Sequence, residues 1–477
     1  MSSNDLLKTR IKRVNSGKID GKSVLYVMSR DQRVQDNHAL LCAQKHALAQ
    51  NLPLAVVFCL QNKSGVRSRE HYEFMLDGLS QVEKELKELN IAFIMLIGSP
   101  EERLETVFYD LRPTAVYFDF NSLRGPKTLL DHLSALDTSP NIYLVDTHNV
   151  VPVWATSDKQ EVGAYTIRPK IHKKFEMYLT EPEQPVVHPL TWKHSVIPTS
   201  ELQATIQGVL DGISESGIVI NFSAGAKSAH ELLENFIANK LDKYSINRNG
   251  PSENCQSDLS PYLHFGNISS LRVALRLRDE ALKSGADLHL LSSSKMPKPE
   301  NARNALLYGI DCLIEEMIVR KELADNFCYY NQFYDSLGSA PSWARISLEI
   351  HKSDHREHVY TLKELEDANT HDTAWNAAQR QLTRTGKMHG YMRMYWAKKV
   401  LEWTESPEQA ITSLVYLNDH YSIDGGDPNG YAGIMWSVAG IHDRPWQERE
   451  IFGVIRYMNY GGLKRKFDIM KYEQQWQ

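Results

Sequence analysis

The chain has 477 residues, of which 42% are hydrophobic and 24% charged, a globular composition that excludes a disordered or a collagen-like protein. The formal net charge of −5 excludes a simple polycation, so any binding of nucleic acid has to come from a local basic face. The sequence contains neither a run of about 18 apolar residues nor an apolar signal core, which predicts a soluble intracellular protein. The five cysteines are scattered without a C-x-x-C pair, which favours neither disulfides nor a structural metal site.

The first 21 residues precede the first apolar run and carry a cluster of cations. These are Lys8, Arg10, Lys12 and Arg13. A basic terminal segment of this kind is typical of a flexible tail, so residues 1–21 are predicted to form a flexible arm.

Residues 22–180 alternate short apolar runs with amphipathic stretches such as Glu70–Leu89. The runs are SVLYVMS, LAVVFCL, IAFIMLI, TAVYFDF and NIYLVD. This alternation predicts a Rossmann-like, doubly wound parallel sheet. Ligands of such sheets lie beyond the carboxyl ends of the strands, which makes Ser29–Asp36 and Asp119–Arg124 candidate lining loops. No G-x-G-x-x-G follows the first strand and no P-loop spacing occurs, so the common nucleotide fingerprints are excluded.

The remainder divides into a connector and a helical domain. Residues 181–228 begin with a proline-dense stretch that resists regular structure, and they are predicted to connect two domains. From 229 to 477 the apolar periodicity is helical almost throughout, which predicts an all-α domain. The fold class is therefore α/β followed by all-α.

The segment Trp375–Val400 is basic and contains no acidic residue. Its cations alternate with aromatic residues; they are Arg380, Arg384, Lys387, Arg393, Lys398 and Lys399. Such a run is either a solvated helix face or a surface that grips phosphates without reading sequence.

Two further blocks allow both a structural and a functional interpretation. Ser257–Ser269 places hydroxyls and a glycine before a helix, which suits either an ordinary helix cap or a diphosphate. Glu315 and Glu316 lie on an otherwise apolar helix, where Glu316 and Arg320 have the spacing of an i,i+4 ion pair.

Tryptophans and a glycine-rich segment complete the candidates. Trp396 and Trp403 are seven residues apart, on one helix face about 10 Å from each other, which fits either a core or a one-electron relay. Trp375 and three tyrosines (Tyr360, Tyr391 and Tyr395) lie nearby in the sequence.

Leu417–Glu450 combines glycine-rich turns, which admit a ligand, with amide and carboxyl groups that can bind the heteroatoms of a flavin or adenine. It ends in a basic-aromatic cluster that includes Arg444 and Trp446.

In order, the motifs MSRDQRVQDNHAL, GAYTIRPKI, LSPYLHFGNIS, EEMIVRKELADNF, WNAAQ, HGYMRMYWAKK, LEWT and DPNGYAGIMWSVAGIHDRPW resemble those of class II cyclobutane pyrimidine dimer photolyases, from about residue 24 to about residue 460. The resemblance implies an N-terminal domain that can hold an antenna chromophore and a helical domain that binds FAD. It also implies light-driven repair: photoexcited reduced FAD donates an electron to a pyrimidine dimer flipped out of double-stranded DNA. A monomer is expected, located in the nucleoid of a prokaryote or in the nucleus of a eukaryote.

The resemblance also assigns roles to single positions. The flavin phosphates and ribityl chain are expected to meet Tyr244, Ser257, Leu259 and Ser260, and the isoalloxazine to meet Arg393, Asn418, Asp424 and Asp427, with Asn418 nearest N5. Trp396, Trp375 and Trp403 correspond, in that order outward, to the family's photoreduction chain. In the substrate site, Glu316 is expected to hydrogen-bond the dimer, Met394 and Trp436 to enclose it, and Arg444 and Arg456 to bind phosphates. Other photolyase classes have an aromatic residue where this chain has Val319, so stacking on the dimer is expected to depend more on Trp436.

Three alternatives stay open at this point. They are a cryptochrome-like blue-light receptor without repair activity, a flavin electron-transfer protein, and a repair enzyme for the 6-4 photoproduct. The antenna is expected to be of the deazaflavin type, although loops such as Ser29–Asp36 suit an empty cleft equally well.

Overall fold

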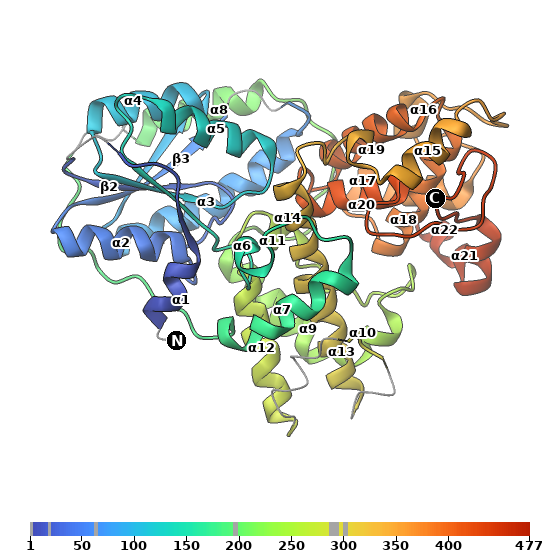
Figure 1. The fold of residues 1–477 in the computed structure, drawn as a ribbon, viewed down its shortest axis with the longest axis horizontal. Helices are drawn as coiled ribbons and strands as arrows, with labels where there is room; N and C mark the ends of the chain where they lie inside the picture. The colour runs from blue at the N-terminus through green and yellow to red at the C-terminus, as the bar shows by residue number, and fades with distance from the viewer. Residues whose placement is uncertain (1–2, 18–20, 62–64, 194–198, 286–294, 299–303) are drawn as a thin grey trace.

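The structure is a computed structural model that describes residues 3–17, 21–61, 65–193, 199–285, 295–298 and 304–477. An α/β part is joined to a larger helical part, and the two lie side by side (Figure 1). The sheet order is β1-β6-β5-β2-β3-β4, with β1 antiparallel to β6 and the other pairs parallel. The strands are β1 (Ile11–Arg13), β2 (Val24–Met28), β3 (Leu54–Leu60), β4 (Ala92–Ile97), β5 (Ala115–Asp119) and β6 (Asn141–Val145). The predicted doubly wound sheet is confirmed.

Helices cover both faces of this sheet. Along β2 the side chains alternate: Tyr26 and Met28 pack on the layer that contains α2 and α3, whereas Leu25 and Val27 pack on the layer that contains α4 and α5. Because both faces are buried, the strands read as continuous apolar runs. The helices of this part are α1 (Ser3–Thr9), α2 (His38–Gln50), α3 (Arg69–Glu88), α4 (Pro100–Leu111), α5 (Arg124–Ala135), α6 (Val153–Thr156) and α7 (Ala164–Tyr178).

The prediction of a flexible N-terminal arm is wrong for residues 3–13. They form α1 and the edge strand β1, in which Ile11 pairs with Val145. Arg10 is 2% exposed, and its guanidinium donates to the carbonyls of Asp146, Asn149 and Val150. A cation that satisfies three buried carbonyls fixes the arm to the sheet, so it is not a solvated tail.

The predicted ligand-lining loops are covered by the helical part. The sheet changes winding direction between β2 and β5, where a ligand crevice is expected. At that point Arg30 and Ser122, which follow these strands, donate to the carboxylate of Asp325 on α14 (Lys321–Tyr330) at 2.8 and 2.7 Å. The helical part therefore occupies the switch point, and these loops form the contact between the two parts.

The connector and the helical part follow. Residues 182–187 have no regular structure, whereas α8 (Thr199–Asp211) lies within the predicted connector. The helical part contains α9 (Ala226–Asn239), α10 (Leu241–Asn247), α11 (Ser260–His264), α12 (Ser270–Lys283), α13 (Ala305–Ile314), α14, α15 (Ser342–Ile350), α16 (Leu362–Glu366), α17 (Thr373–Thr385), α18 (Gly390–Trp403), α19 (Pro407–Tyr421), α20 (Pro428–Ala439), α21 (Tyr460–Lys466) and α22 (Ile469–Gln475). Among the described helices, none is long and apolar enough to cross a membrane.

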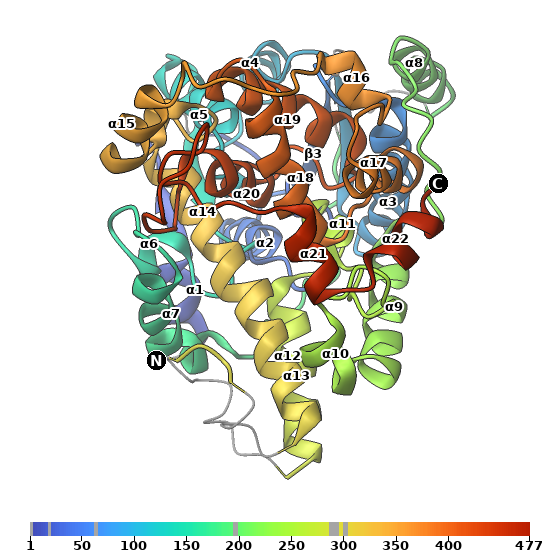
Figure 2. The ribbon, with the colours of Figure 1, turned by 90° about the vertical axis from the view of Figure 1, so that its right-hand side faces the viewer.

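A π-helical turn joins α13 to α14. The three form one long element, which crosses the front of the view in Figure 2. The turn, η3, spans Glu315–Arg320, and π-helical turns often occur at functional sites. Its wider winding brings Glu315 and Arg320, five residues apart, within 3.0 Å of each other.

Gly266 is a point of close backbone contact between the two parts. Its φ is +69°, and a Cβ there would lie 2.4 Å from both the carbonyl oxygen of Arg30 and the Cα of Asp31. We expect Gly266→Ala to lower the free energy of unfolding by roughly 2–5 kcal/mol, because it adds left-handed strain and a backbone clash. Thermal unfolding measures this loss. Gly125→Ala is the control: nothing lies within 4 Å of a Cβ in α5 there, so its melting temperature should not fall.

Candidate functional site

Three buried indoles form a chain between α17 and α18. The ring centroids of Trp396 and Trp375 are 6.4 Å apart and the planes nearly parallel, and those of Trp375 and Trp403 are 5.7 Å apart. The Trp375 indole N–H donates to the carbonyl of Trp396 at 3.0 Å, which holds the two helices in register. Trp375 thus lies between two tryptophans of the same helix face, as the relay order requires.

The outer end of this chain reaches solvent through Tyr360 and His371. Trp403 meets both rings edge-on, at 5.5 and 5.1 Å, and the Tyr360 hydroxyl lies 2.7 Å from His371 Nδ1. Tyr391 packs instead on Phe467, and Tyr395 donates to Asp372. Of the three tyrosines near in sequence, Tyr360 is the one that contacts Trp403.

Arg393 forms the predicted charged pair with Asp424. Arg393 Nη2 lies 3.2 Å from Asp424 Oδ1 and donates to the Ser422 hydroxyl at 2.8 Å, while Nη1 is 3.4 Å from Asn418 Oδ1. Burial alone would raise the pKa of Asp424, but the Arg393 guanidinium and the Ser422 hydroxyl hold it well below its usual range. Asp424 is therefore a fixed anion beside a fixed cation and a buried amide.

Asp427 is held by three elements. Its carboxylate caps α20 by accepting from the Asn429 backbone N–H at 3.0 Å, and it lies 3.2 Å from His264 Nδ1 on α11. Arg30 of the α/β part approaches to 3.7 Å. Burial opposes ionisation of Asp427, but His264 and Arg30 keep its pKa well below the usual range. Helix capping thus accounts for part of its role.

In the segment Ser257–Ser269 the structure shows a helix cap, while the binding of a diphosphate stays a prediction. Ser269 is an ordinary N-cap, because its hydroxyl accepts from the Arg272 N–H at 2.8 Å. Ser260 begins α11 and its hydroxyl helps to lower the pKa of Asp424, so it joins the Arg393 cluster. Leu259 is buried and Ser257 half-buried in the segment before α11.

Glu316 pairs with Arg248, and Arg320 pairs with Glu315. Arg248 Nη1 lies 2.5 Å from Glu316 Oε1, and its guanidinium covers the Tyr244 ring at 5.8 Å. Glu315 is bound by Arg168 of α7 at 2.7 Å. The predicted i,i+4 pair is therefore absent, and a side chain 68 positions before Glu316 takes its place. The Glu316 side chain is 46% exposed, so it remains accessible to a substrate.

Trp436 belongs to a row of alternating cation–π contacts between arginine and tryptophan side chains. Arg456 lies between Trp436 and Trp446, at 5.3 and 4.2 Å from their centroids, and Arg444 covers Trp446 at 5.8 Å. Arg456 also makes two 2.9 Å hydrogen bonds to Asp443. Arg444 is exposed, whereas the charge of Arg456 is already compensated. The basic-aromatic cluster of the sequence is thus a spatial cluster.

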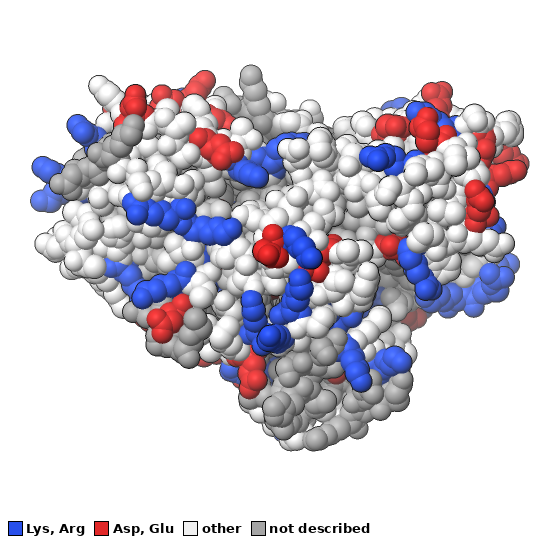
Figure 3. Space-filling model, viewed as in Figure 1, with Lys and Arg blue, Asp and Glu red and all other residues white. Residues whose placement is uncertain are grey.

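Three cations of the basic run Trp375–Val400 do not form a solvent-facing surface. Lys398 is fully buried, Lys399 is 7% exposed and bound to Glu402, and Lys387 is half-buried and bound to Asp258. Both interpretations of the run as a solvent-facing surface are therefore wrong for these three residues, whereas Arg384 on α17 is exposed. Figure 3 shows Lys and Arg gathered over α21 instead, whose last turn carries exposed Lys464, Arg465 and Lys466. No prediction from the sequence included this basic turn.

The cluster around Arg393 fits the polar edge of a flavin. An isoalloxazine presents both donors and acceptors, and Arg393, Asn418 and Asp424 supply cationic donors, an amide and an anionic acceptor. Gly430 keeps space beside the amide, because a Cβ there would lie 2.8 Å from Asn418 Nδ2. Met394, next to Arg393 on α18, is half-buried.

The comparisons with known proteins identify the family of the chain. The DNA photolyase family profile matches residues 24–188. The deoxyribodipyrimidine photo-lyase of Potorous tridactylus is 43% identical over 95% of this chain and 81% of its own length, and that of Methanothermobacter thermautotrophicus is 38% identical over 97% of both. That of Oryza sativa is 42% identical over 95% of this chain and 87% of its own.

Solved structures share the fold. A class III photolyase from Agrobacterium tumefaciens has a TM-score of 0.69 at 17% identity, covering 96% of this chain and 87% of its own. A Synechocystis cryptochrome has a TM-score of 0.68 at 15% identity, covering 95% and 88%. An archaeal photolyase from Sulfolobus tokodaii, described with two FAD molecules and a novel light-harvesting cofactor, has a TM-score of 0.65 at 16% identity, covering 95% and 90%. By its identity to curated relatives over almost its whole length, the chain belongs to the deoxyribodipyrimidine photo-lyases of the DNA photolyase family.

Proposed function

We propose that the chain is a class II photolyase that uses light and FAD to split cyclobutane pyrimidine dimers in double-stranded DNA. One observation carries the proposal: α18 holds the Arg393 of the flavin cluster, the Trp396 of the indole chain and a lysine that contacts Trp436. A single rigid helix therefore joins cofactor, relay and the proposed dimer site. Bound FAD, once reduced and photoexcited, supplies the electron that opens the cyclobutane ring.

The flavin-binding residues orient the cofactor and set the charge around it. Asn418 presents its amide to N5, and the Arg393–Asp424 pair provides fixed charges that need no rearrangement during electron transfer. Asp427 and Ser260 bind through a carboxylate and a hydroxyl from α20 and α11. Tyr244, Ser257 and Leu259 line the phosphate and ribityl end.

The remaining residues transfer electrons to the flavin or bind the lesion. Trp403, Trp375 and Trp396, in that order, pass electrons inward from the surface. Met394 and Trp436 exclude water from the extruded dimer, which is easier to extrude than an intact pair because the lesion weakens stacking. Glu316 hydrogen-bonds the dimer, and Arg444 binds a neighbouring phosphate.

The decisive experiment uses a duplex with one thymine dimer. Purified protein should restore the two thymines under blue light and leave them joined in the dark, with flavin absorption in the protein. No preference for the lesion, combined with no restoration in light, would instead favour the receptor alternative.

Arg444→Ala should weaken binding to damaged and undamaged duplex alike, because a phosphate contact carries no sequence information. The slope of log affinity against log salt should fall by about one unit. Arg456→Ala should flatten that slope less, since Asp443 already compensates its charge. Titrations at several salt concentrations measure both. An unchanged slope for Arg444→Ala would remove it from the phosphate contacts.

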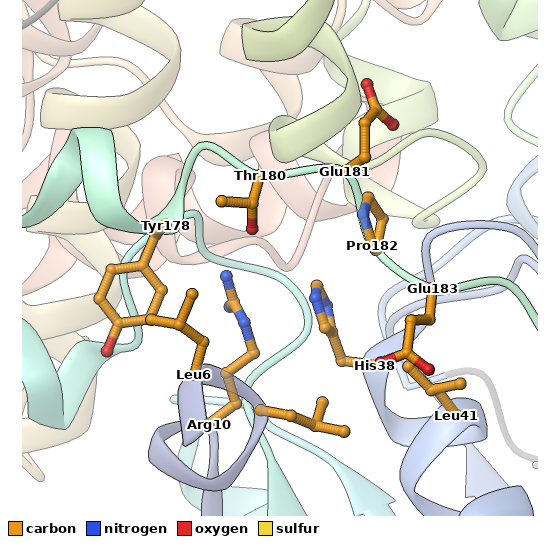
Figure 4. Close-up of a pocket in the computed structure, with 10 residues that line it drawn as sticks. Leu6, Arg10, His38, Leu41, Tyr178, Thr180, Glu181, Pro182 and Glu183 are labelled. Carbon is orange, nitrogen blue, oxygen red and sulfur yellow. The ribbon is translucent and has the colours of Figure 1, made fainter. Parts of the chain in front are cut away.

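We propose a deazaflavin-type antenna in the α/β part, on the basis of the family resemblance alone. The cavity in Figure 4, which is lined by Arg10, His38 and Thr180, has about 30 Å³, room for a water molecule and not for a tricyclic ring. This cavity is therefore not the proposed antenna site. An absorption band in the near blue beyond the flavin bands would support a deazaflavin, whereas two FAD per chain would support a second flavin.

We propose further that the enzyme acts as a monomer on chromosomal DNA, in the nucleoid or the nucleus. Sedimentation of the holoenzyme at several concentrations tests the first part. A concentration-dependent dimer would contradict it.

A further inference from the structure

Lys398 is a buried cation without a carboxylate partner. It is 0% exposed, and among the described residues no carboxylate oxygen lies within 4 Å of its ammonium. Its Nζ donates to the carbonyl of Ser437 at 3.0 Å and lies 4.5 Å from the centroid of the Trp436 indole. Burying an unpaired ammonium is costly, so this position calls for a reason other than stability.

Its two contacts are to consecutive residues of α20. The hydrogen bond fixes the backbone at Ser437, and the cation lies against the indole of Trp436, which is half-buried. The Trp436 indole also contacts a second cation, because the Arg456 guanidinium lies 5.3 Å from the ring centroid. Cation–π attraction is strongest when the cation is desolvated, as Lys398 is.

We propose that Lys398 is a positioning residue that holds Trp436 as the wall of the dimer pocket, and that its charge makes lesion recognition sensitive to pH. The proposal rests on the role of Trp436 in the proposed function. Charged Lys398 fixes the indole by the cation–π contact and the hydrogen bond together. Neutral Lys398 keeps a donor for Ser437 but loses the attraction to the ring.

The surrounding charges set the pH at which this change occurs. Burial lowers the pKa of Lys398 to about 7; Asp443 opposes this shift and Arg456 adds to it. These two groups come from the segment after α20 and are paired with each other, while α20 itself contains no charged side chain. On α18 the neighbouring Lys399 is paired with Glu402, and on α19 Asp419 accepts from Asn418 and Tyr431. On α17 Arg384 donates to the chain terminus. His442 stays neutral over this range because burial lowers its pKa to about 4.

The test is dark binding of the holoenzyme to a single-dimer duplex and to its undamaged twin, between about pH 6 and about pH 8.5. The ratio of the two affinities should fall roughly tenfold in the parent as pH rises through about 7, because the folded pKa lies there. Lys398→Arg should keep a high, flat ratio, since a guanidinium stays charged. Lys398→Met should show a low, flat ratio with normal flavin content.

Several outcomes would overturn the proposal without touching the function. A parent ratio that does not change with pH, or a Lys398→Arg variant with the same decline as the parent, would show that Lys398 does not control the wall. Should Lys398→Met fail to fold, the parent and Lys398→Arg still decide. Trp436→Ala serves as the reference: if the parent prefers the lesion and Trp436→Ala keeps that preference, the wall itself is misplaced, and the proposed dimer site fails instead.

Discussion

Trp396→Phe is expected to abolish steady light-driven reduction of oxidised FAD while leaving repair by the chemically reduced enzyme intact. Trp396 is the inner member of the indole chain, stacked on Trp375 at 6.4 Å, and phenylalanine is far harder to oxidise. In the proposed relay the electron for photoreduction passes this position, whereas the electron that repairs the dimer does not. Absorption at the oxidised flavin band under continuous light, with an external reductant, measures the first reaction.

Two matched variants separate the relay from general damage to the fold. Trp375→Phe should give the same loss, because it breaks the chain between its two neighbours. Trp154→Phe removes an indole that donates to the carbonyl of Thr9 in the α/β part, so photoreduction should be normal. Normal photoreduction in Trp396→Phe would refute the relay assignment.

Local periodicity predicted much of the fold because buried strands and amphipathic helices each have a recognisable hydrophobic pattern within a short stretch of sequence. The strands β2 to β6 are continuous apolar runs, and α3 and α18 follow helical spacing. The edge strand β1 has the sequence IKR and only three residues, too short and too polar for such a pattern. It forms because β6 offers unpaired backbone groups and because Arg10 finds three carbonyls from the segment after β6.

Sequence patterns predicted less of the site than of the fold, because the contacts of the site join segments that are distant in the sequence. Helical spacing placed Trp396 and Trp403 on one face, but Trp375 between them came from the resemblance. The run of cations on α17 and α18 suggested a surface, yet Lys398 is buried, since charge in a sequence does not show which way a helix faces. The partner of Glu316 lies 68 residues before it, outside any local window.

Glu316→Ala is expected to lower the repair yield about fivefold, the equivalent of about 1 kcal/mol, with FAD still bound. In the proposed function the carboxylic acid of Glu316 donates a hydrogen bond to a base carbonyl of the dimer, and that contact strengthens as negative charge develops on the bases. In the structure Glu316 is paired with Arg248 at 2.5 Å and its side chain is partly exposed, so it has to leave this ion pair to donate to the lesion. Glu316→Gln keeps a donor of similar shape and should lose less. The yield of restored thymines per absorbed photon measures both.

A variant of Arg248 distinguishes whether the loss of repair yield in Glu316→Ala arises from the contact to the dimer or from damage to the fold. Its guanidinium is mostly buried over Tyr244, and Glu316 raises its pKa against the opposing effect of burial. Removing Glu316 therefore leaves a buried cation unpaired, which by itself destabilises the flavin side of the pocket. Arg248→Met removes that cation and leaves the carboxyl group in place. If Arg248→Met repairs like the parent while Glu316→Ala loses yield, the carboxyl group acts on the dimer. If both lose FAD or yield equally, the pair is structural, and the contact to the dimer has to be assigned to another residue.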